Sequence, residues 1–358
     1  MPIHFDWSVK NMNKVRWGVI GAGGIADRRT IPGLLLANNA ELIAVMEVNM
    51  ELAEKIRAKH NAKRAYDNID SLLADNEIDA VYIATPVIYH KEQAIKAAKA
   101  KKHILIEKPV ALTIKEGEEV LQVCKEEGIK IAVGLMMRFH SYHQKMKEIV
   151  YSGKLGKVVS CRAQLTCWYP DMPGSWRQTK ATSGGGALMD MGVHCIDLLQ
   201  YITGAKVIKV AGLINTKTFN YEVEDSSSIL LELDNQSFGY VDANFNIPDA
   251  AAKCRLEIYG TKGSLLAEGT ISQVEGGRLD VVLSEDSLAY NAQQDRCDVS
   301  ALDVQVDFGN MYTKEIESFC NSILNDSAIE VIAEDALRVQ KVVESAYESA
   351  KTAKFVYL

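Results

Sequence analysis

Val15-Arg-Trp-Gly-Val-Ile20, an apolar run, leads directly into Gly21-Ala-Gly23-Gly-Ile-Ala26, which has the pattern G-x-G-x-x-A. The apolar run predicts a buried strand, and helical periodicity resumes after the glycines. Gly21 permits a tight turn, Gly23 lets a phosphate approach the backbone, and the small Ala26 lets the helix pack on the strand. Unpaired N–H groups at the start of that helix would then face the phosphates of a dinucleotide. An ordinary glycine turn is the alternative that this pattern alone leaves open.

The same alternation of strand and helix continues to residue 134. Short apolar runs that predict buried strands lie at 41–46, 78–84, 103–107 and 129–134, and helix patterns separate them at 50–61, 89–100 and 113–127. Thr113 and Glu116 have the spacing of a capping box at the start of the last helix. Repeated βα units predict a parallel sheet whose ligand site lies at the carboxyl ends of the strands.

Glu47 follows the second apolar run, roughly twenty residues beyond the glycines. An acid at this place in a dinucleotide-binding fold binds the hydroxyls of the adenosine ribose. The next residue is Val48, so no basic side chain follows at once to accept a 2′-phosphate, which favours NAD over NADP. Arg28 and Arg29 lie near the predicted phosphate site and keep NADP open. A solvated loop acid is the alternative interpretation of Glu47.

Two further strand ends carry chemistry. Thr85-Pro86 follows the run at 78–84, and Glu107-Lys108-Pro109 ends the run at 103–107. Since parallel strands point their carboxyl ends to one edge, these residues should meet the glycine turn there. Lys108 would then be a cation beside a nicotinamide, and its bond to Pro109 is one that can be cis. A simple pairing of Lys108 with Glu107 at a solvated edge is the alternative.

Past Gly134 the pattern changes to strands joined by short turns. Strand runs lie at 157–168, 206–214, 227–233, 238–245, 254–259 and 279–283, and helices are predicted at 138–151, 312–324 and 333–351. Strands linked by hairpin turns predict an antiparallel sheet. We therefore expect a polar N-terminal arm at 1–13, a Rossmann dinucleotide-binding domain at 14–135, and a substrate-binding and oligomerisation domain at 136–358 with a long loop at 284–307.

The stretch Ser183-Gly-Gly-Gly-Ala-Leu-Met-Asp190-Met-Gly-Val-His194-Cys-Ile-Asp197 combines a triple glycine with a helix pattern. Residues four apart on a helix share a face, so Asp190 and His194 should point into one space, and Asp197 could touch the same imidazole. An imidazole oriented by a carboxylate moves protons near neutral pH. The glycines would let the backbone approach a ligand closely. A surface helix with incidental charges is the alternative.

Composition excludes several classes of protein. The 358 residues are 47% hydrophobic and 24% charged, which is ordinary for a globular chain of about two domains. The net charge of −7 argues against nucleic acid as a partner, since phosphate backbones require a basic face. We expect no membrane span and no metal site, because no apolar run is long enough and no His, Cys and Asp cluster has ligand spacing. Seven cysteines without a C-x-x-C pair favour a reduced, cytoplasmic setting.

Together these motifs resemble the Gfo/Idh/MocA family, which includes glucose–fructose oxidoreductase and inositol dehydrogenase. The resemblance rests on the glycine turn, Thr85-Pro86 with His90, Glu107-Lys108-Pro109, Gly153-Lys-Leu-Gly156, the stretch from Gly184 to Asp197, and Glu334-Asp-Ala-Leu-Arg-Val. It implies an α/β protein with an N-terminal Rossmann parallel sheet and a C-terminal α/β domain whose mostly antiparallel, open sheet forms a homo-oligomer, a dimer or tetramer. It also implies a pyridine-dinucleotide oxidoreductase acting on a sugar, polyol or related cyclic alcohol. Val87 departs from the family's usual Asn after Thr-Pro, which loosens the expectation for contacts near the nicotinamide ribose.

Spacing and resemblance assign candidate residues to three roles. For the cofactor, NAD with NADP as the alternative, they are Gly21, Gly23, Gly24, Ile25, Glu47, Thr85, Pro86, His90, Glu107 and Lys108. In catalysis, His194 transfers the proton, Asp190 binds a substrate hydroxyl and His194, and Lys108 donates to the reacting oxygen or shares the base role. Aromatic faces suit sugar rings, and Arg suits hydroxyls or carboxylates. For the substrate we therefore expect Asp190 and His194 with Arg138, His140, Tyr142, Trp168, Tyr169, Trp176, Arg177 and Lys180.

Three functions are compatible with these residues. The first is an NAD-dependent dehydrogenase or oxidase that turns an alcohol of a sugar, polyol or glycoside into a keto sugar. The second keeps NAD tightly bound without net redox change, so that transient oxidation assists epimerisation, elimination or glycoside cleavage. The third is a dinucleotide-binding regulator without catalysis, against which Lys108, Asp190 and His194 speak. The residues do not separate the first from the second.

Overall fold

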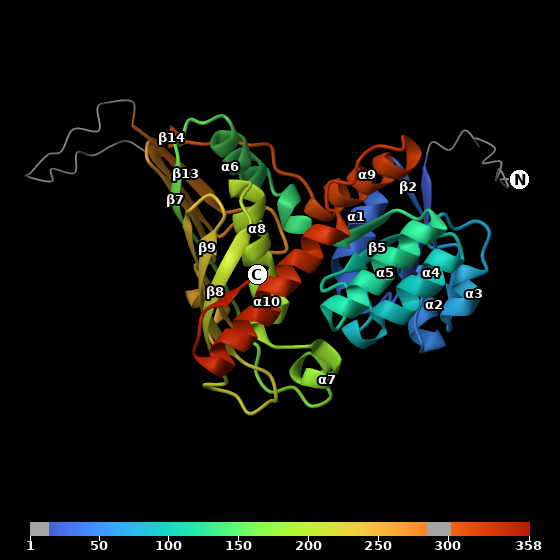
Figure 1. Cartoon of the computed structure of the whole chain (residues 1–358). Coiled ribbons are helices and arrows are strands. Elements are labelled where there is room, and N and C mark those ends of the chain that lie inside the picture. The colour runs from blue at the N-terminus through green and yellow to red at the C-terminus, as the bar shows by residue number, and fades with distance from the viewer. Residues whose placement is uncertain (1–13, 285–301) are drawn as a thin grey trace, which may run out of the picture.

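The computed structural model describes residues 14–284 and 302–358 (Figure 1). The arm expected at 1–13 and most of the loop expected at 284–307 lie outside the described residues. Within them the chain forms two sheets, each with its own helices, and α10 (Ala333–Thr352) runs alongside both halves (Figure 1).

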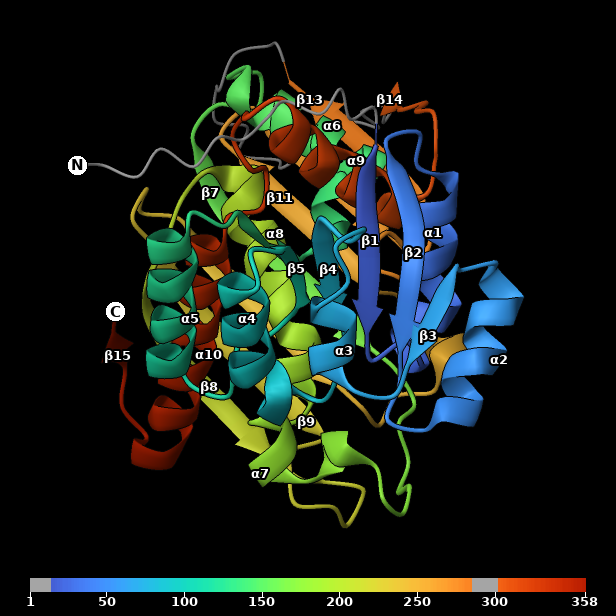
Figure 2. The ribbon, with the colours of Figure 1, turned by 90° about the vertical axis from the view of Figure 1, so that its right-hand side faces the viewer.

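The first sheet is parallel and has six strands among the described residues. In the spatial order β3-β2-β1-β4-β5-β6 they are Arg64–Tyr66, Ala40–Met46, Val15–Ile20, Ala80–Ile83, His103–Glu107 and Ile131–Gly134. This is the strand order of a doubly wound dinucleotide-binding fold, in which ligands bind outside the carboxyl ends of the strands. Figure 2 shows the sheet with its helices, α1 (Ile31–Leu36), α2 (Met50–His60), α3 (Ile69–Leu73), α4 (His90–Lys99) and α5 (Ile114–Glu127).

Local sequence explains most of this half. Thr113 caps α5 by accepting a hydrogen bond from the backbone N–H of Glu116 at 3.2 Å, and Gly128 ends the helix at a φ of 68°. The parallel sheet predicted from the βα pattern is confirmed. Strand β3 was not predicted, because its three residues are too few for a hydrophobic pattern and pair only with β2.

The second sheet has nine strands within the described ranges, in the order β14-β13-β12-β11-β7-β10-β9-β8-β15. From β7 to β15 they are Val158–Thr166, Val207–Asn215, Ser226–Leu233, Phe238–Asn244, Arg255–Gly260, Gly263–Glu268, Arg278–Leu283, Leu302–Asp303 and Val356–Tyr357. Strand β10 pairs with β7 in parallel, and the other pairs are antiparallel. The mostly antiparallel sheet is therefore confirmed. The sequence patterns missed β12, β14 and β15, two of which have only two residues.

Helices cover one face of the second sheet and leave the other open (Figure 1). On the covered face, α8 (Val193–Thr203) packs on β7 and α10 on β8, while α6 (Ser141–Tyr151) packs on α8. Leu213, Leu230, Phe238 and Tyr240 share the opposite face through the strand register and remain exposed. Among the described residues, this face therefore carries four exposed apolar side chains that no helix covers.

Helix α9 (Met311–Leu324) returns to the first sheet, although the sequence assigned residues 136–358 to the second domain. Phe319 and Cys320 join the buried cluster around Trp17, whose Nε1 donates to Cys320 Sγ at 3.4 Å. The helix packs against α1, next to the glycine turn (Figure 1). A segment from the end of the chain thus becomes part of the first domain's core.

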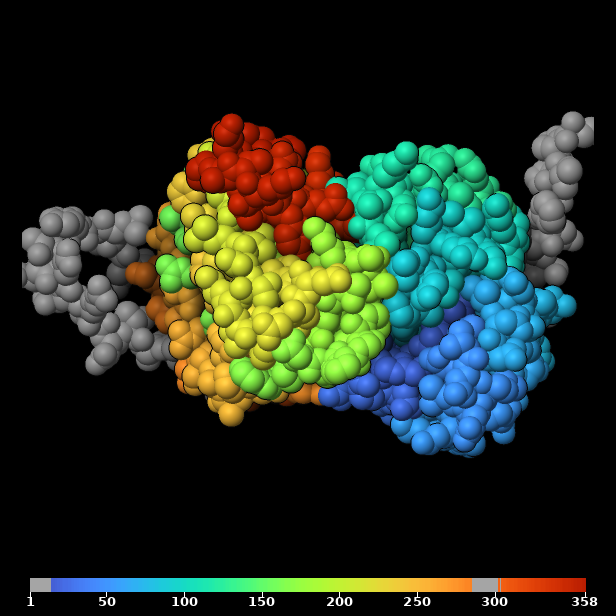
Figure 3. All heavy atoms as spheres, turned by 90° about the horizontal axis from the view of Figure 1, so that it is seen from below, coloured from blue at the N-terminus to red at the C-terminus, as the bar shows by residue number. Residues whose placement is uncertain are grey.

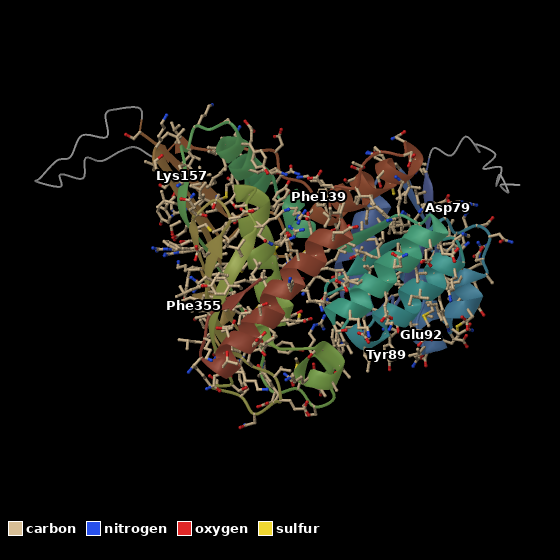
Figure 4. The ribbon with its side chains drawn as sticks, in the orientation of Figure 1. Asp79, Tyr89, Glu92, Phe139, Lys157 and Phe355 are labelled. Atoms are coloured by element: carbon tan, nitrogen blue, oxygen red, sulfur yellow. The ribbon has the colours of Figure 1, made fainter. Side chains whose placement is uncertain are left out.

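His140 and His143 are buried together where the chain passes between the domains, just after Phe139, which Figure 4 labels at that junction. Their ring centroids are 4.6 Å apart, and His143 Nδ1 lies 2.7 Å from the Met137 carbonyl oxygen. Burial lowers the pKa of His143 to about 3, with His140 acting in the same direction, and burial lowers the pKa of His140 to about 4. Both rings are therefore neutral in the folded protein near neutral pH.

We predict that His143 makes the folded protein sensitive to acid. Its pKa is lower in the folded chain than the unfolded value of 6.5, so the unfolded state binds the extra proton and stability falls as the pH drops from about 6.5 towards 3. Between pH 4 and 6, the free energy of unfolding should fall by roughly 1 kcal/mol more per pH unit in the wild type than in His143→Gln. Denaturant unfolding across this range measures both slopes. Equal slopes below pH 6 would contradict the prediction, and the slopes should agree above pH 7.

Candidate active site

A cavity of about 610 Å³ lies between the two domains, at the carboxyl ends of the parallel strands. Seen from below, the first domain in blue and teal meets the second in green and yellow side by side (Figure 3). Predicted site residues from both domains line this cavity: Ile25, Thr85, His90, Glu107, Lys108, Tyr169, Trp176, Arg177, Asp190 and His194. Tertiary folding therefore brings half of the predicted residues to one place.

The glycine turn, residues 21–26, adjoins the cavity through Ile25, which lines it. Gly21 has a φ of 76°, and a Cβ there would lie 2.7 Å from Cγ2 of Thr85. The backbone N–H of Gly23 donates to Oε1 of Glu47 at 2.6 Å, and a Cβ on Gly24 would meet no atom within 4 Å. The turn is thus bare on its outer side, as a phosphate requires. Glu47 and Pro86 belong to the surrounding loops and do not form the cavity wall among the described residues.

The His90 ring lies between the loops that follow β4 and β5 and contacts both of them. Its Nε2 lies 2.9 Å from the Thr85 carbonyl oxygen, and its Nδ1 lies 2.9 Å from the Pro109 carbonyl oxygen. Burial lowers the pKa of the ring, so a neutral imidazole donates to one of these carbonyls. The Lys108–Pro109 bond is cis. His90 therefore positions Thr85 and Lys108 relative to each other.

Lys108 pairs with Asp190 across the domain boundary. Its Nζ lies 2.9 Å from Oδ1 of Asp190 and also donates to the Asp190 carbonyl oxygen. Arg177 Nε is 3.7 Å from the same carboxylate oxygen. Burial alone would raise the pKa of Asp190, but Lys108 and Arg177 outweigh it and hold that pKa well below its usual range. The alternative partner, Glu107, instead accepts a hydrogen bond from the Tyr82 hydroxyl.

The triple glycine serves a contact within the protein. A Cβ on Gly186 would lie 2.0 Å from the Glu224 carbonyl oxygen, and one on Gly185 would lie 2.1 Å from the Tyr347 hydroxyl. The Glu224 carboxylate accepts from the N–H groups of Gly186 at 2.9 Å and Leu188 at 3.0 Å. We expected these glycines to approach a ligand; Gly185 lines the cavity, whereas Gly186 approaches Glu224, which lies just before β9. This contact anchors the segment that carries Asp190.

The segment from Leu188 to Gly192 is π-helical and continues into α8. A π-helix closes its hydrogen bonds over five residues, so the four-residue spacing of Asp190 and His194 is not a full turn. His194 Nδ1 is buried without a hydrogen-bond partner in the described residues. Burial, with Lys108 acting in the same direction, lowers the pKa of His194 to about 3 although Asp190 opposes the shift. The cavity therefore combines a charged Lys108–Asp190 pair with a neutral imidazole.

Asp197 does not touch His194. Its carboxylate accepts from Nε of Arg138 at 3.0 Å and from Nη2 at 2.5 Å, and both side chains are buried. Arg138 also reaches Asp335 on α10 at 3.1 Å. Arg138 is therefore a structural residue that ties α8 to α10, and it lies outside the cavity where we expected a substrate ligand.

Four other substrate candidates also lie away from the cavity wall described above. His140 and Tyr142 are buried and pack against Phe308, with ring centroids 6.0 and 5.2 Å apart. Trp168 is 45% exposed and packs against Phe219, while its strand neighbours Cys167 and Tyr169 line the cavity. Alternate residues of an extended segment face opposite sides, which explains why Trp168 points away. Lys180 is not part of the wall either.

Sequence reasoning missed several residues that line the cavity. They are Asp249, Ser272, Gln273 and Tyr312, with Cys167 beside them. The first three come from irregular segments between strands, and Tyr312 comes from the first turn of α9. No local pattern marks such residues, because only the folded chain places them here.

Fold and site together define a dinucleotide-binding oxidoreductase. The family model described as "Oxidoreductase family, NAD-binding Rossmann fold" matches residues 15–135, and that described as "GFO/IDH/MocA C-terminal domain" matches residues 143–266. The chain belongs to the Gfo/Idh/MocA oxidoreductase family, which confirms the resemblance seen in the sequence. The order of its two matched regions agrees with the two sheets.

Several relatives of the chain are named for carbohydrate substrates. The chain is 26% identical over 259 residues to 1,5-anhydro-D-fructose reductase of Ensifer adhaerens, covering 72% of this chain and 77% of that protein. It is 25% identical over 376 residues to D-glucoside 3-dehydrogenase of Escherichia coli, covering 98% and 99%. The crystal structure of aldose-aldose oxidoreductase from Caulobacter crescentus superposes with a TM-score of 0.86 at 23% identity, covering 96% and 100% of the two chains. The last comparison shows a shared fold.

No group of three or more His, Cys, Asp or Glu side chains in residues 14–284 and 302–358 is placed to hold a metal ion. Over the same residues, no helix has both the length and the apolar character needed to cross a bilayer.

We predict that the buried pair of Asp197 and Arg138 is a stability element. Asp197→Asn should lower the free energy of unfolding by about 3 kcal/mol, because it leaves Arg138 buried without its full charge partner. Denaturant unfolding measures the change. Glu257→Gln is the matched control, since Glu257 faces the exposed Arg162 at 3.8 Å and should matter by less than about 1 kcal/mol. Asp197→Asn with wild-type stability would refute the structural role.

Proposed function

We propose that this protein oxidises a secondary alcohol of a sugar, polyol or glycoside with NAD, giving a keto sugar. The observation that carries the proposal is the Lys108–Asp190 pair, 2.9 Å apart beside His194 in the cavity between the two domains. The relatives named D-glucoside 3-dehydrogenase and 1,5-anhydro-D-fructose reductase support a carbohydrate substrate.

The dinucleotide would be held by this chain's glycine turn and strand ends. Gly21, Gly23, Gly24 and Ile25 would receive the phosphates, Glu47 the adenosine ribose, and the ends of β4 and β5 the nicotinamide half. A dinucleotide held there would supply the acceptor for the hydride that leaves the alcohol carbon. The fit is supported by the open space beside Gly24 and by an unpaired buried hydroxyl, that of Tyr312, in the cavity wall.

Lys108 and His194 divide the proton chemistry. The ammonium of Lys108 stabilises negative charge that develops on the reacting oxygen, and Asp190 holds that ammonium in place. His194 is neutral near pH 7, so its imidazole can take the hydroxyl proton. With Nδ1 buried, Nε2 is the nitrogen that faces the substrate. Lys108 can share the base role once its ammonium group has passed a proton to another group.

Substrate contacts come from the second domain. Arg177 lies 4.4 Å above the centroid of the Trp176 ring, and both side chains line the cavity with Tyr169. The stacked arginine has donors for sugar hydroxyls or a carboxylate, and Tyr169 offers an aromatic face for a ring. We therefore place the sugar between this group and Asp190.

We also propose that the chain is a homo-oligomer, a dimer or tetramer, and that it works in the cytoplasm. The open sheet face with exposed Leu213, Leu230 and Phe238 supports self-association, because burial of apolar surface drives assembly. The six described cysteines are unpaired, which supports a reducing setting.

Turnover of a substrate panel tests the proposed reaction. With NAD supplied and a panel of inositols, hexoses, sugar acids and aryl glucosides, at least one substrate should raise NADH absorbance. Lys108→Ala should reduce that rate by roughly 10²–10⁴-fold, because the charge on the reacting oxygen loses its cation. Lys101→Ala, which removes an exposed pair with Glu127, is the matched control. Turnover of Lys108→Ala within a few-fold of wild type would overturn the assignment.

The same assay separates the alternative functions. If no substrate raises NADH while the denatured protein releases NAD, the redox-neutral use of tightly bound NAD replaces the dehydrogenase proposal. A protein that binds no dinucleotide at all would refute both.

The position of Glu47 predicts which cofactor the protein prefers. The Glu47 carboxylate stands at the glycine turn, 2.6 Å from the Gly23 nitrogen, and would repel a 2′-phosphate. NADH should therefore bind at least about 10-fold more tightly than NADPH, and Glu47→Gln should narrow the difference. Fluorescence titration measures both affinities. Tighter binding of NADPH by the wild type would assign NADP as the cofactor instead.

A further inference from the structure

The wall of the cavity contains a buried hydroxyl without a partner. Tyr312 is 3% exposed, its side chain lines the cavity, and its hydroxyl makes no hydrogen bond in the described part of the chain. Buried polar groups in folded proteins are nearly always hydrogen-bonded. A buried hydroxyl without a partner therefore indicates that a hydrogen-bonding group binds beside it. Because Tyr312 lines the cavity, a bound ligand can supply the missing hydrogen-bond partner.

Close packing keeps Tyr312 in position. A Cβ on Gly33 of α1 would lie 2.7 Å from the Tyr312 Cβ, so the two helices touch at this residue. The Thr313 hydroxyl donates to the Gly33 carbonyl oxygen at 2.8 Å. Asn310 caps α9 by accepting from the Thr313 N–H at 3.2 Å. The tyrosine backbone is thus held on both sides and cannot turn away from the cavity.

The surroundings of Tyr312 indicate what kind of group it meets. Its pKa is raised by burial and then by the carboxyl groups of Glu107 and Glu315, while Arg29 and Arg28 act in the opposite direction. Tyr312 lines the cavity together with Glu107, at the end of β5, and Arg28, just after the glycine turn. Its hydroxyl remains protonated and can donate a hydrogen bond.

Two acids lie behind this part of the wall. Glu107 lines the cavity and takes one hydrogen bond from Tyr82, whose hydroxyl in turn accepts from Thr30 at 3.0 Å. Glu315 is 4% exposed, its Oε1 has no partner in the described residues, and burial raises its pKa well above the usual range. A ligand group placed between the donating Tyr312 hydroxyl and the Glu107 carboxyl should accept one hydrogen bond and donate another. A primary amide matches, because its carbonyl accepts and its NH₂ donates.

We propose that the Tyr312 hydroxyl donates to the carbonyl oxygen of the nicotinamide carboxamide, while Glu107 accepts from the amide nitrogen. Tyr312 is then a cofactor-positioning residue that a distant part of the chain supplies to the first domain. This inference rests on the proposed function, since it takes the dinucleotide as the ligand of the cavity.

The test compares three ligands by calorimetry on the intact protein. Tyr312→Phe should weaken NADH binding about 5- to 10-fold, the loss of one hydrogen bond. It should leave ADP-ribose, which lacks nicotinamide, within 2-fold of wild type. It should weaken reduced thionicotinamide adenine dinucleotide by less than about 3-fold, because sulfur is a poor acceptor. A merely structural role for Tyr312 would weaken all three ligands alike.

Tyr66→Phe is the matched control, because it removes another tyrosine hydroxyl from the first domain, one bonded to Asp75 outside the cavity. It should bind all three ligands as the wild type does. Unchanged NADH affinity in Tyr312→Phe would overturn the inference and leave the proposed function standing, whereas a wild type that binds neither NADH nor NADPH would refute the proposed function itself.

If Tyr312→Phe does not fold, the inference can still be tested by comparing two ligands on the wild-type protein. The wild type should bind NADH at least about 5-fold more tightly than the thionicotinamide analogue. Equal affinity for the two would overturn the inference.

Discussion

The ion pair between Lys108 and Asp190 is the interaction on which the site depends. Its two atoms are 2.9 Å apart, yet one residue ends a parallel strand and the other begins the helical segment of the second domain. Burial would favour a neutral carboxyl, and the lysine with Arg177 keeps it charged. In a low-dielectric cavity such a pair must be held by its surroundings, since two unheld charges would be better solvated in water. The scaffold around it supplies that support.

Support comes from both sides of the pair. On the first domain, His90 bridges the Thr85 and Pro109 carbonyl groups and so fixes the loop that carries Lys108. On the second, Glu224 holds the N–H groups of Gly186 and Leu188, and it can do so only because Gly186 has no side chain. Behind α8, Arg138 joins Asp197 to Asp335 and fixes the helix against α10. The candidate residues from the sequence thus divide into those that line the cavity and those that hold the surrounding segments in place.

The same burial gives the two halves of the site different electrostatic character. Asp190 keeps its charge because cations surround it, whereas His194 loses its proton because burial and Lys108 both disfavour the imidazolium. A cation and a neutral imidazole in one cavity form an arrangement that can stabilise an alkoxide and accept a proton. Spacing alone had suggested an Asp190–His194 hydrogen bond, but the π-helical turn separates that pair and leaves His194 Nδ1 without a partner.

The family resemblance implied that Asp190 joins Lys108. Local patterns alone were enough to predict the parallel first sheet, the antiparallel second sheet, the glycine turn, and the meeting of Thr85 and Lys108 at one edge of the first sheet. These features follow from periodicity and turn residues, whose effects act over a few neighbouring positions. Long-range contacts decided the rest. Arg138 pairs with Asp197, 59 residues away, Thr313 of α9 bonds to Gly33, 280 residues away, and Glu224, just before β9, contacts Gly186, 38 residues away. Such partners are chosen by packing and by the need to satisfy buried charges and hydroxyls, which no short stretch of sequence records.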